Sequence, residues 1–209
     1  MKFSNFYLLD NSLVKNKVSL IRDKNCSVSQ FRNLVKDLSI FLCYEACKDL
    51  KLEVSKIETP LEETDGFSFG PICFVAVLRA GLGMVPGALE CVPDASVGNI
   101  GMFRNEETLK PVRYYCNLPK NISEGHVFIL DPMLATGGSI CDAIDVVKEH
   151  NVTDITCLCL ISAPEGIKKV NEKHPDVKIY SASLDRELNS KGYIMPGLGD
   201  AGDRIFGTL

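Results

Sequence analysis

The segment Asp131–Ser139, which reads DPMLATGGS, combines residue types that bind a phosphate group. Gly137 and Gly138 let the backbone turn tightly and approach a ligand without a Cβ in the way. Thr136 and Ser139 add hydroxyl donors. A helix that begins near Gly138 would direct its free N–H groups and its positive dipole end at the same anion. The segment therefore predicts a cradle for a monophosphate.

An acidic residue opens this segment, and it cannot serve to bind the phosphate because it would repel it. Asp131 instead suits the hydroxyl groups of a sugar that carries the phosphate. The segment is not a Walker A loop, since the GxxxxGK[ST] pattern is absent and the segment contains no lysine. A glycine pair at a helix start is common in proteins without any ligand. The combination of apolar strand, acid, hydroxyls and helix is more specific, and it predicts binding of a phosphorylated sugar.

A second glycine-bearing segment, RAGLGM at residues 79–84, follows the apolar run Ile72–Leu78. Arg79, placed directly after a strand, suits a pyrophosphate group. Gly81-Leu-Gly83 also begins like a dinucleotide-binding fingerprint, but its sixth position is Pro86. A nucleotide-binding oxidoreductase is therefore an alternative, one that leaves DPMLATGGS without a role.

The elements that must position these segments alternate between strand-like and helical patterns from residue 70 to residue 185. Such alternation predicts an α/β fold with a mostly parallel sheet flanked by helices. In such sheets the loops at the carboxyl ends of the strands bind ligands. The predicted helices are Met84–Leu89, Gly138–Glu149 and Pro164–Lys173. The predicted strands are Ile72–Leu78, Ala95–Met102, Val112–Asn117, Val127–Leu130, Ile155–Ser162 and Val177–Ser183.

The two ends of the chain have different patterns. Apolar residues recur at three- and four-residue spacing over Val28–Leu50, which predicts an amphipathic helix with Ser29 as its N-cap. Four glycines and a proline lie in Tyr193–Gly207, from which we expect a looped hood without a regular helix. The polar stretch Asn105–Lys110 between two predicted strands indicates a β flap. We interpret the chain as one domain, residues 1–209, with an N-terminal helical extension (1–68), an α/β core (70–185) and the hood (193–207).

The composition limits the class of protein. Hydrophobic residues make up 45% of the chain and the formal net charge is −4, which argues against binding of nucleic acid or of an anionic membrane surface. We find no apolar run of about 20 residues that would span a membrane. The nine cysteines form no CxxC pair, so we interpret them as reduced thiols rather than zinc ligands. These features predict a cytoplasmic enzyme.

Both glycine-bearing segments resemble those of the type I phosphoribosyltransferases, whose phosphate loop follows an apolar strand with acids and Thr-Gly-Gly-Thr/Ser. The usual pair of acids is reduced here to Asp131 followed by Pro132. That variant, the RAGLGM segment, the GMFRNEET segment (Gly101–Thr108) and the glycine-rich C-terminal stretch are all similar to the uracil phosphoribosyltransferases. The resemblance implies transfer of phosphoribose from phosphoribosyl pyrophosphate (PRPP) to uracil, giving UMP and pyrophosphate in pyrimidine salvage.

The resemblance also implies roles for individual residues. The implied catalytic residues are Asp131, Arg79 and Arg104. The implied uracil-binding residues are Ile194, Gly199, Asp200 and Ala201. PRPP is expected at Arg79, Arg104, Asp131, Pro132, Met133, Leu134, Ala135, Thr136, Gly137, Gly138, Ser139 and Asp200. Mg²⁺ is expected to arrive with PRPP, without a direct protein ligand other than Asp200. A cis peptide bond is expected at or beside Leu78–Arg79.

Several expectations stay open at this stage. The resemblance also implies GTP as a candidate effector, and it implies that the protein assembles as a homodimer or homotetramer. A protein of the same fold that has lost catalysis and acts as a regulator is one alternative function. A phosphoribosyltransferase for another base, above all a purine, is the nearest alternative among enzymes.

Overall fold

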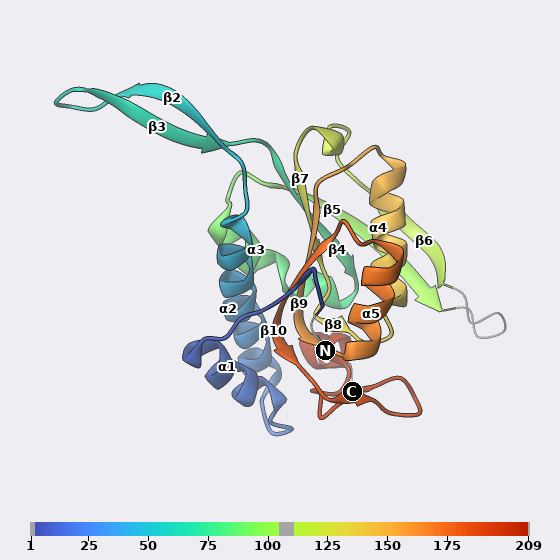
Figure 1. Cartoon of the computed structure of the whole chain (residues 1–209). Coiled ribbons are helices and arrows are strands. Elements are labelled where there is room, and N and C mark those ends of the chain that lie inside the picture. The colour runs from blue at the N-terminus through green and yellow to red at the C-terminus, as the bar shows by residue number, and fades with distance from the viewer. Residues whose placement is uncertain (1–2, 105–110, 209) are drawn as a thin grey trace.

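The computed structural model describes residues 3–104 and 111–208 and is built on one large sheet (Figure 1). This eight-stranded sheet has the order β1-β10-β9-β7-β4-β5-β6, with β8 pairing to β9. Among the described strands of this sheet, only β5 and β6 pair antiparallel, so the expected mostly parallel sheet is confirmed. The strands are β1 (Phe6–Leu8), β4 (Ile72–Leu78), β5 (Ser96–Arg104), β6 (Pro111–Asn117), β7 (His126–Leu130), β8 (Met133–Leu134), β9 (Ile155–Ser162) and β10 (Lys178–Leu184).

Helices cover both faces of the sheet, as the continuous apolar strands predict. Successive side chains of a strand point to opposite faces. In β4, Phe74 packs with the helices on one face, whereas Val75 and Val77 pack with those on the other. The first face carries α1 (Ser12–Arg22), α2 (Val28–Cys47) and α3 (Val85–Cys91), and the second carries α4 (Gly138–Glu149) and α5 (Pro164–Lys173), as Figure 1 shows.

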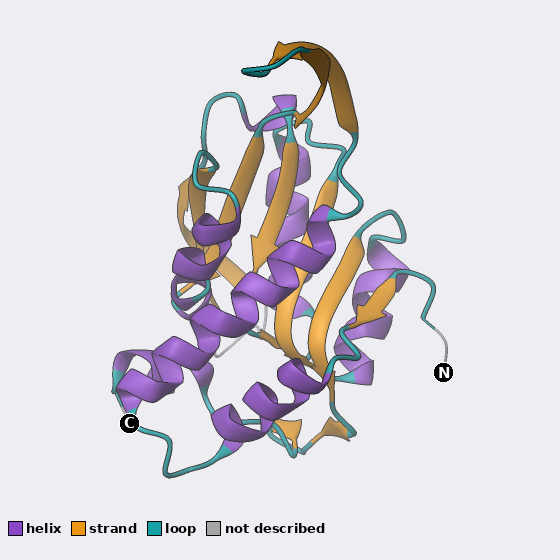
Figure 2. Ribbon diagram, turned by 90° about the vertical axis from the view of Figure 1, so that its left-hand side faces the viewer, coloured by secondary structure: helices purple, strands orange, loops and turns teal. Residues whose placement is uncertain are grey.

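The N-terminal part departs from the expected helical extension. Helix α2 is present, but Ser27 rather than Ser29 caps it, in a capping box with Gln30. β1 forms the edge of the main sheet, and β2 (Leu52–Glu58) and β3 (Glu63–Phe69) form a hairpin that projects from the body (Figures 1 and 2). Nearly all side chains of this hairpin are exposed. Its few apolar residues, such as Leu52 and Val54 in β2 and Phe67 and Phe69 in β3, are separated by charged and polar residues and are exposed, so the pattern is too short to predict strands on its own.

The C-terminal hood contains regular structure that its glycines led us not to expect. It holds β12 (Ile194–Met195), which pairs with β11 (Glu187–Leu188), and the helix α6 (Ala201–Phe206). Asp200 caps α6 through a bond from the Asp203 N–H, and Gly202 is the one hood glycine inside the helix. The other hood glycines have positive φ angles and form the turns on either side.

Two further expectations concern the flap and the membrane. The flap segment Asn105–Lys110 lies outside the described residues, and the strands on either side of it, β5 and β6, pair antiparallel. Within residues 3–104 and 111–208, no helix is both long and apolar enough to cross a membrane.

Candidate active site

Two adjoining pockets open at the carboxyl ends of β4 and β7. These strands are parallel neighbours, so Arg79 and Asp131, which follow them, reach the same edge of the sheet. The first pocket, of about 300 Å³, is lined by Val77, Leu78, Arg79, Ala80, Asp131, Met133, Ser139, Asp200 and Gly202. The second, of about 230 Å³, is lined by Ala80, Asp131, Met133, Ala135, Gly192, Tyr193, Ile194, Gly199, Asp200, Ala201 and Gly202. Asp131 and Asp200 belong to both walls, so the pockets form one two-part site.

The predicted phosphate loop has the geometry that its sequence requires. Gly137 has φ +77°, a left-handed conformation, and a Cβ there would lie 2.8 Å from the Gly166 carbonyl oxygen. Helix α4 begins at Gly138, as predicted. The Gly138 N–H donates to the Thr136 hydroxyl oxygen at 3.4 Å. Glycine at residue 137 is therefore needed both for the turn and for its contact with α5.

Two residues of the loop hold it in place instead of lining a pocket. The Pro132 carbonyl oxygen accepts bonds from the N–H groups of Leu160 and Ile161, at 3.1 and 3.0 Å. The Leu134 carbonyl oxygen accepts from the Ala163 N–H at 2.9 Å, and the Leu134 side chain is buried in the core. The sequence did not indicate this short strand, β8, within the loop. The predicted PRPP contacts of Pro132 and Leu134 stay predictions.

Asp131 is a carboxyl group in an unusual environment. Burial raises its pKa to about 7, and the bond that its Oδ1 accepts from the Met133 N–H opposes the rise. Because this pKa is close to neutral pH, a charged ligand that binds nearby can change the protonation of Asp131. Perturbed carboxyl groups in clefts are frequent in active sites.

Arg79 lies at the wall of the first pocket beside the hood. The peptide bond between Leu78 and Arg79 is cis, as expected from the resemblance. The Arg79 Nη2 is 3.1 Å from the Asp203 Oδ1, and its guanidinium lies 5.8 Å from the centre of the Phe206 ring. Helix α6 of the hood thus holds the arginine that the sequence assigned to pyrophosphate. For Arg104, only the backbone at the end of β5 is described.

A buried ion pair fixes the first turn of the hood. Asp185 is only 6% exposed and pairs with Arg22, which ends α1. Arg22 also donates to the Gly197 carbonyl oxygen at 2.7 Å, and the Gly197 N–H donates to Asp185 Oδ2 at 2.8 Å. Burying two charged side chains costs free energy, and the attraction between them together with their further hydrogen bonds offsets that cost. The Arg22–Asp185 pair therefore fixes the backbone beside the second pocket.

A second arginine, Arg204, stabilises the hood through hydrogen bonds to backbone oxygens. Arg204, in α6, donates to the carbonyl oxygens of Ile21, Leu198 and Asp23 at 2.6 to 2.9 Å. Its guanidinium also lies 4.4 Å from the centre of the Phe31 ring. The sequence analysis missed both this contact and the Arg22–Asp185 pair, because the partners lie far apart in the chain and form no local motif.

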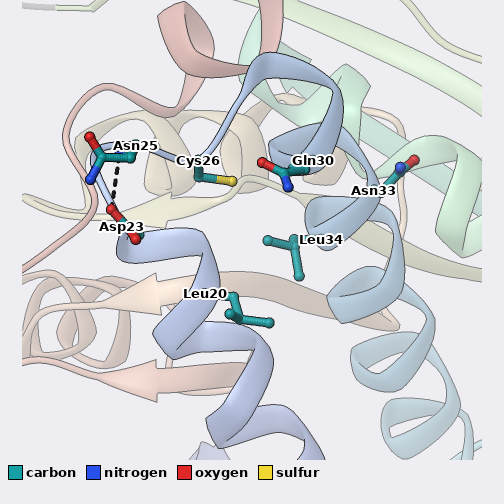
Figure 3. Close-up of a pocket in the computed structure, with 7 residues that line it drawn as sticks. All are labelled: Leu20, Asp23, Asn25, Cys26, Gln30, Asn33 and Leu34. Carbon is teal, nitrogen blue, oxygen red and sulfur yellow. Dashed lines mark hydrogen bonds between the residues drawn. The ribbon is translucent and has the colours of Figure 1, made fainter.

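A larger cavity, of about 460 Å³, lies elsewhere, between α1 and α2 (Figure 3). It contains none of the residues singled out by the sequence, and its lining is Leu20, Asp23, Asn25, Cys26, Gln30, Asn33 and Leu34. The carboxylate of Asp23 there accepts the Asn25 N–H at 2.8 Å, as the dashed line in Figure 3 marks. Size alone therefore does not identify the site, whereas convergent polar groups at the sheet edge do.

Comparisons with known proteins agree with this geometry. The family model described as "Uracil phosphoribosyltransferase" matches residues 8–208. A uracil phosphoribosyltransferase of Finegoldia magna is 53% identical over 203 residues, covering 96% of this chain and 97% of the relative. One from Salinibacter ruber is 51% identical over 205 residues, covering 98% of each.

Solved structures share the fold. A protein of Aquifex aeolicus has a TM-score of 0.90 and 41% identity, covering 96% of this chain and 97% of that one. A hypoxanthine-guanine phosphoribosyltransferase of Bacillus anthracis has a TM-score of 0.54 and 15% identity, covering 80% and 83%, and so shows a shared fold alone. By its matching family model and its near full-length relatives, the chain belongs to the uracil phosphoribosyltransferase family.

Proposed function

We propose that this protein transfers the 5-phosphoribosyl group of PRPP to N1 of uracil, giving UMP and pyrophosphate. The observation that carries the proposal is the two-part site, in which Asp131 and Asp200 belong to both pockets. One part has the phosphate loop and Arg79 at its wall, and the other lies under the hood. A reaction that joins a phosphorylated sugar to a flat base needs two such compartments with a shared wall.

In this mechanism the phosphate loop fixes one end of PRPP. Its N–H groups and hydroxyls bind the 5′-phosphate, and Arg79 and Arg104 stabilise the pyrophosphate as it leaves. Positive charge develops on the ribose ring as the bond from C1 to oxygen breaks. Asp131, as a carboxylate that accepts the ribose hydroxyls, holds the ring and stabilises that charge. Fixing both ends of PRPP places C1 against the base.

The hood selects the base. Backbone N–H and C=O groups around Ile194 and Gly199–Ala201 suit the alternating acceptors and donors of uracil. Cytosine carries an amino group in place of one carbonyl, so it would leave a backbone N–H unpaired in the pocket. Hydrogen bonds from the hood also favour the reactive tautomer or anion of uracil, and the N1 proton passes to the leaving pyrophosphate or to water, so the mechanism needs no general base from a side chain.

Mg²⁺ bound by PRPP fits this site better than a metal held by the protein alone. The described residues contain no group of three or more His, Cys, Asp or Glu that could hold a metal ion. Asp131 and Asp200 supply two carboxylates at the first pocket, and Mg²⁺ typically takes one or two carboxylates plus substrate phosphates. One oxygen of Asp200 already caps α6. When bound, the cation would neutralise charge on the leaving pyrophosphate.

The projecting hairpin supports self-association. Leu52, Val54 and Phe67 in β2 and β3 are 55%, 62% and 68% exposed. Apolar side chains gathered on an exposed hairpin typically mark a protein interface. We therefore propose a homodimer or homotetramer. GTP as a candidate effector rests on the family resemblance and not on this hairpin. PRPP is multiply charged and does not cross a lipid bilayer unaided, so we place the reaction in the cytoplasm.

The test is an assay of UMP formation with uracil, cytosine, hypoxanthine and guanine as competing acceptors, with and without Mg²⁺ and GTP. We expect product from uracil, dependence on Mg²⁺, and little product from the other bases. Product from a purine in preference to uracil would point to another base. No product from any base, with retained PRPP binding, would favour a regulator that has lost catalysis. Analytical sedimentation in the same buffers measures the oligomeric state of the protein.

A further inference from the structure

We propose that Lys169 of α5 is a further ligand of the 5′-phosphate, which supplies from a neighbouring helix the positive charge that the phosphate loop itself lacks. This inference rests on the proposed function, because it names a residue for the same substrate. The loop Asp131–Ser139 contains no lysine or arginine. Its neutral N–H and hydroxyl donors would otherwise face a dianionic phosphate beside the carboxyl groups of the same site.

The first turn of α5 is built against the phosphate loop. A Cβ on Gly166 would lie 2.4 Å from the Ala135 carbonyl oxygen, and one on Gly137 would lie 2.8 Å from the Gly166 carbonyl oxygen. Contacts this close are accessible only to glycine on both sides. Residues three apart on a helix share a face, so the residue that follows Gly166 by three positions, Lys169, points to the same loop.

The side chain of Lys169 lies next to the two glycines of the phosphate loop, Gly137 and Gly138. Its Cβ lies 3.3 Å from the position of a Cβ on Gly137, and its ammonium nitrogen lies 3.7 Å from that of a Cβ on Gly138. Gly138 is the first residue of α4, where the free N–H groups of the helix lie. The ammonium group therefore lies beside the N-terminus of α4, and an ammonium group and free helix N–H groups that reach the same anion bind it better than either alone.

The other lysines of α5 are paired, and this one is not. Lys168 lies 3.8 Å from Glu172, and Lys173 pairs with Asp145. Lys169 is exposed and forms no hydrogen bond or ion pair within the part of the chain that the structure describes. Burial raises the pKa of Asp142 in α4, and the ammonium groups of Lys173 and Lys169 oppose that rise. The charge of Lys169 thus acts on α4 at Asp142, although no ion pair joins the two side chains among the described residues.

The test compares Lys169→Met and Lys169→Arg with Lys168→Met, a matched control at the adjacent exposed position of the same helix. We expect Lys169→Met to raise the KM for PRPP and the Kd for UMP by roughly 5- to 20-fold, the range of a charge-assisted bond weakened by solvent. The KM for uracil and kcat should stay within about twofold, because phosphate binding contributes equally to ground and transition states. Lys169→Arg should remain close to the unaltered protein, and Lys168→Met should match it.

A second probe separates a phosphate ligand from a general charge effect. Inhibition by pyrophosphate, which occupies the Arg79 end, should not change in Lys169→Met. Equal losses for UMP and pyrophosphate, or a KM for PRPP equal to that of Lys168→Met, would overturn the inference. If the unaltered protein forms no UMP yet binds ribose 5-phosphate, and Lys169→Met loses that binding, the proposed function fails while the lysine remains a phosphate ligand. Melting temperatures of all variants identify any that do not fold.

Discussion

Residues of the phosphate loop and of the hood line the same two pockets, but the two segments are held in different ways. The loop consists of contiguous residues between β7 and α4, and its anchors lie on the elements that follow it, β9 and α5. The hood is fixed by Arg22 and by backbone oxygens of Ile21 and Asp23, more than 170 residues away in the sequence. The loop is therefore held by elements that lie near it in the sequence, whereas the hood depends on contacts with the far end of the chain.

The largest expected effect comes from Asp131→Asn, at the point where the two regions meet. The change removes a carboxylate that faces both pockets and keeps the shape of the side chain. We expect kcat/KM for PRPP to fall by about 100- to 1,000-fold, the range seen when a preorganised electrostatic group is removed. Steady-state kinetics measure it. A loss below tenfold would mean that Asp131 does not stabilise the charge on the ribose.

The same variant should be more stable than the unaltered protein at alkaline pH. Burial raises the pKa of Asp131 from 3.8 to about 7, so the folded state binds the proton more tightly than the unfolded state does. The stability that this proton contributes is present below pH 4 and is lost as the pH rises through 7. Asp131→Asn should therefore gain about 1–3 kcal/mol at pH 8, discounted for partial exposure, and nothing near pH 4. Melting curves at both pH values, without substrate, check the sign.

The second effect tests the long-range support of the hood. Asp185→Asn leaves Arg22 without its buried partner, and breaking such a pair costs about 3–5 kcal/mol. We expect a large drop in melting temperature and a KM for uracil raised roughly 10- to 30-fold, with the KM for PRPP nearly unchanged. Arg186→Gln is the matched control, because Arg186 is exposed and pairs only with the adjacent Glu187 among the described residues. Equal changes in both KM values would show that the hood and the loop are not held independently.

This contrast also explains what the sequence could predict. The strands β4 and β9 and the helices α4 and α5 occupy the predicted residues, because their apolar patterns and turn residues are local. The sequence also indicated that Arg79 and Asp131 lie at the same edge of the sheet, because each directly follows a strand of a parallel sheet. The roles of Arg22, Asp185 and Arg204 could not be predicted, because each depends on a partner that only the tertiary structure brings near.

Two expectations were wrong, for different reasons. The glycines of the hood predict no regular helix, yet only Gly202 falls within α6, and Asp200 caps its start. The hairpin β2–β3 stands where a helical extension was expected, because almost all of its side chains are exposed and no buried face marks it as strand. Patterns of burial predict strands only where the burial occurs within the same chain.

The third effect tests the local geometry of the phosphate loop. Gly137→Ala forces a left-handed conformation on a residue with a Cβ, and that Cβ would lie 2.8 Å from the Gly166 carbonyl oxygen. We expect the KM for PRPP to rise about five- to tenfold, from the roughly 1–2 kcal/mol that this conformation costs, and the KM for uracil to stay the same. Gly207→Ala is the control, because Gly207 has φ +70° but its Cβ would meet only Val28 at 3.5 Å. A KM for PRPP that rises equally in both variants would assign the effect to general strain.

The smallest effect tests whether the two regions act on each other. Asp203, in the hood helix α6, lies 3.1 Å from the guanidinium of Arg79, which is more than half exposed. Exposed pairs of this kind contribute at most about 1 kcal/mol, and pyrophosphate must compete with Asp203 for the arginine. Asp203→Asn should therefore lower the KM for PRPP about two- to threefold at low salt, with the difference fading at high salt as charges are screened. A higher KM instead would mean that Asp203 positions Arg79 for the pyrophosphate, so that the hood contributes to binding both substrates.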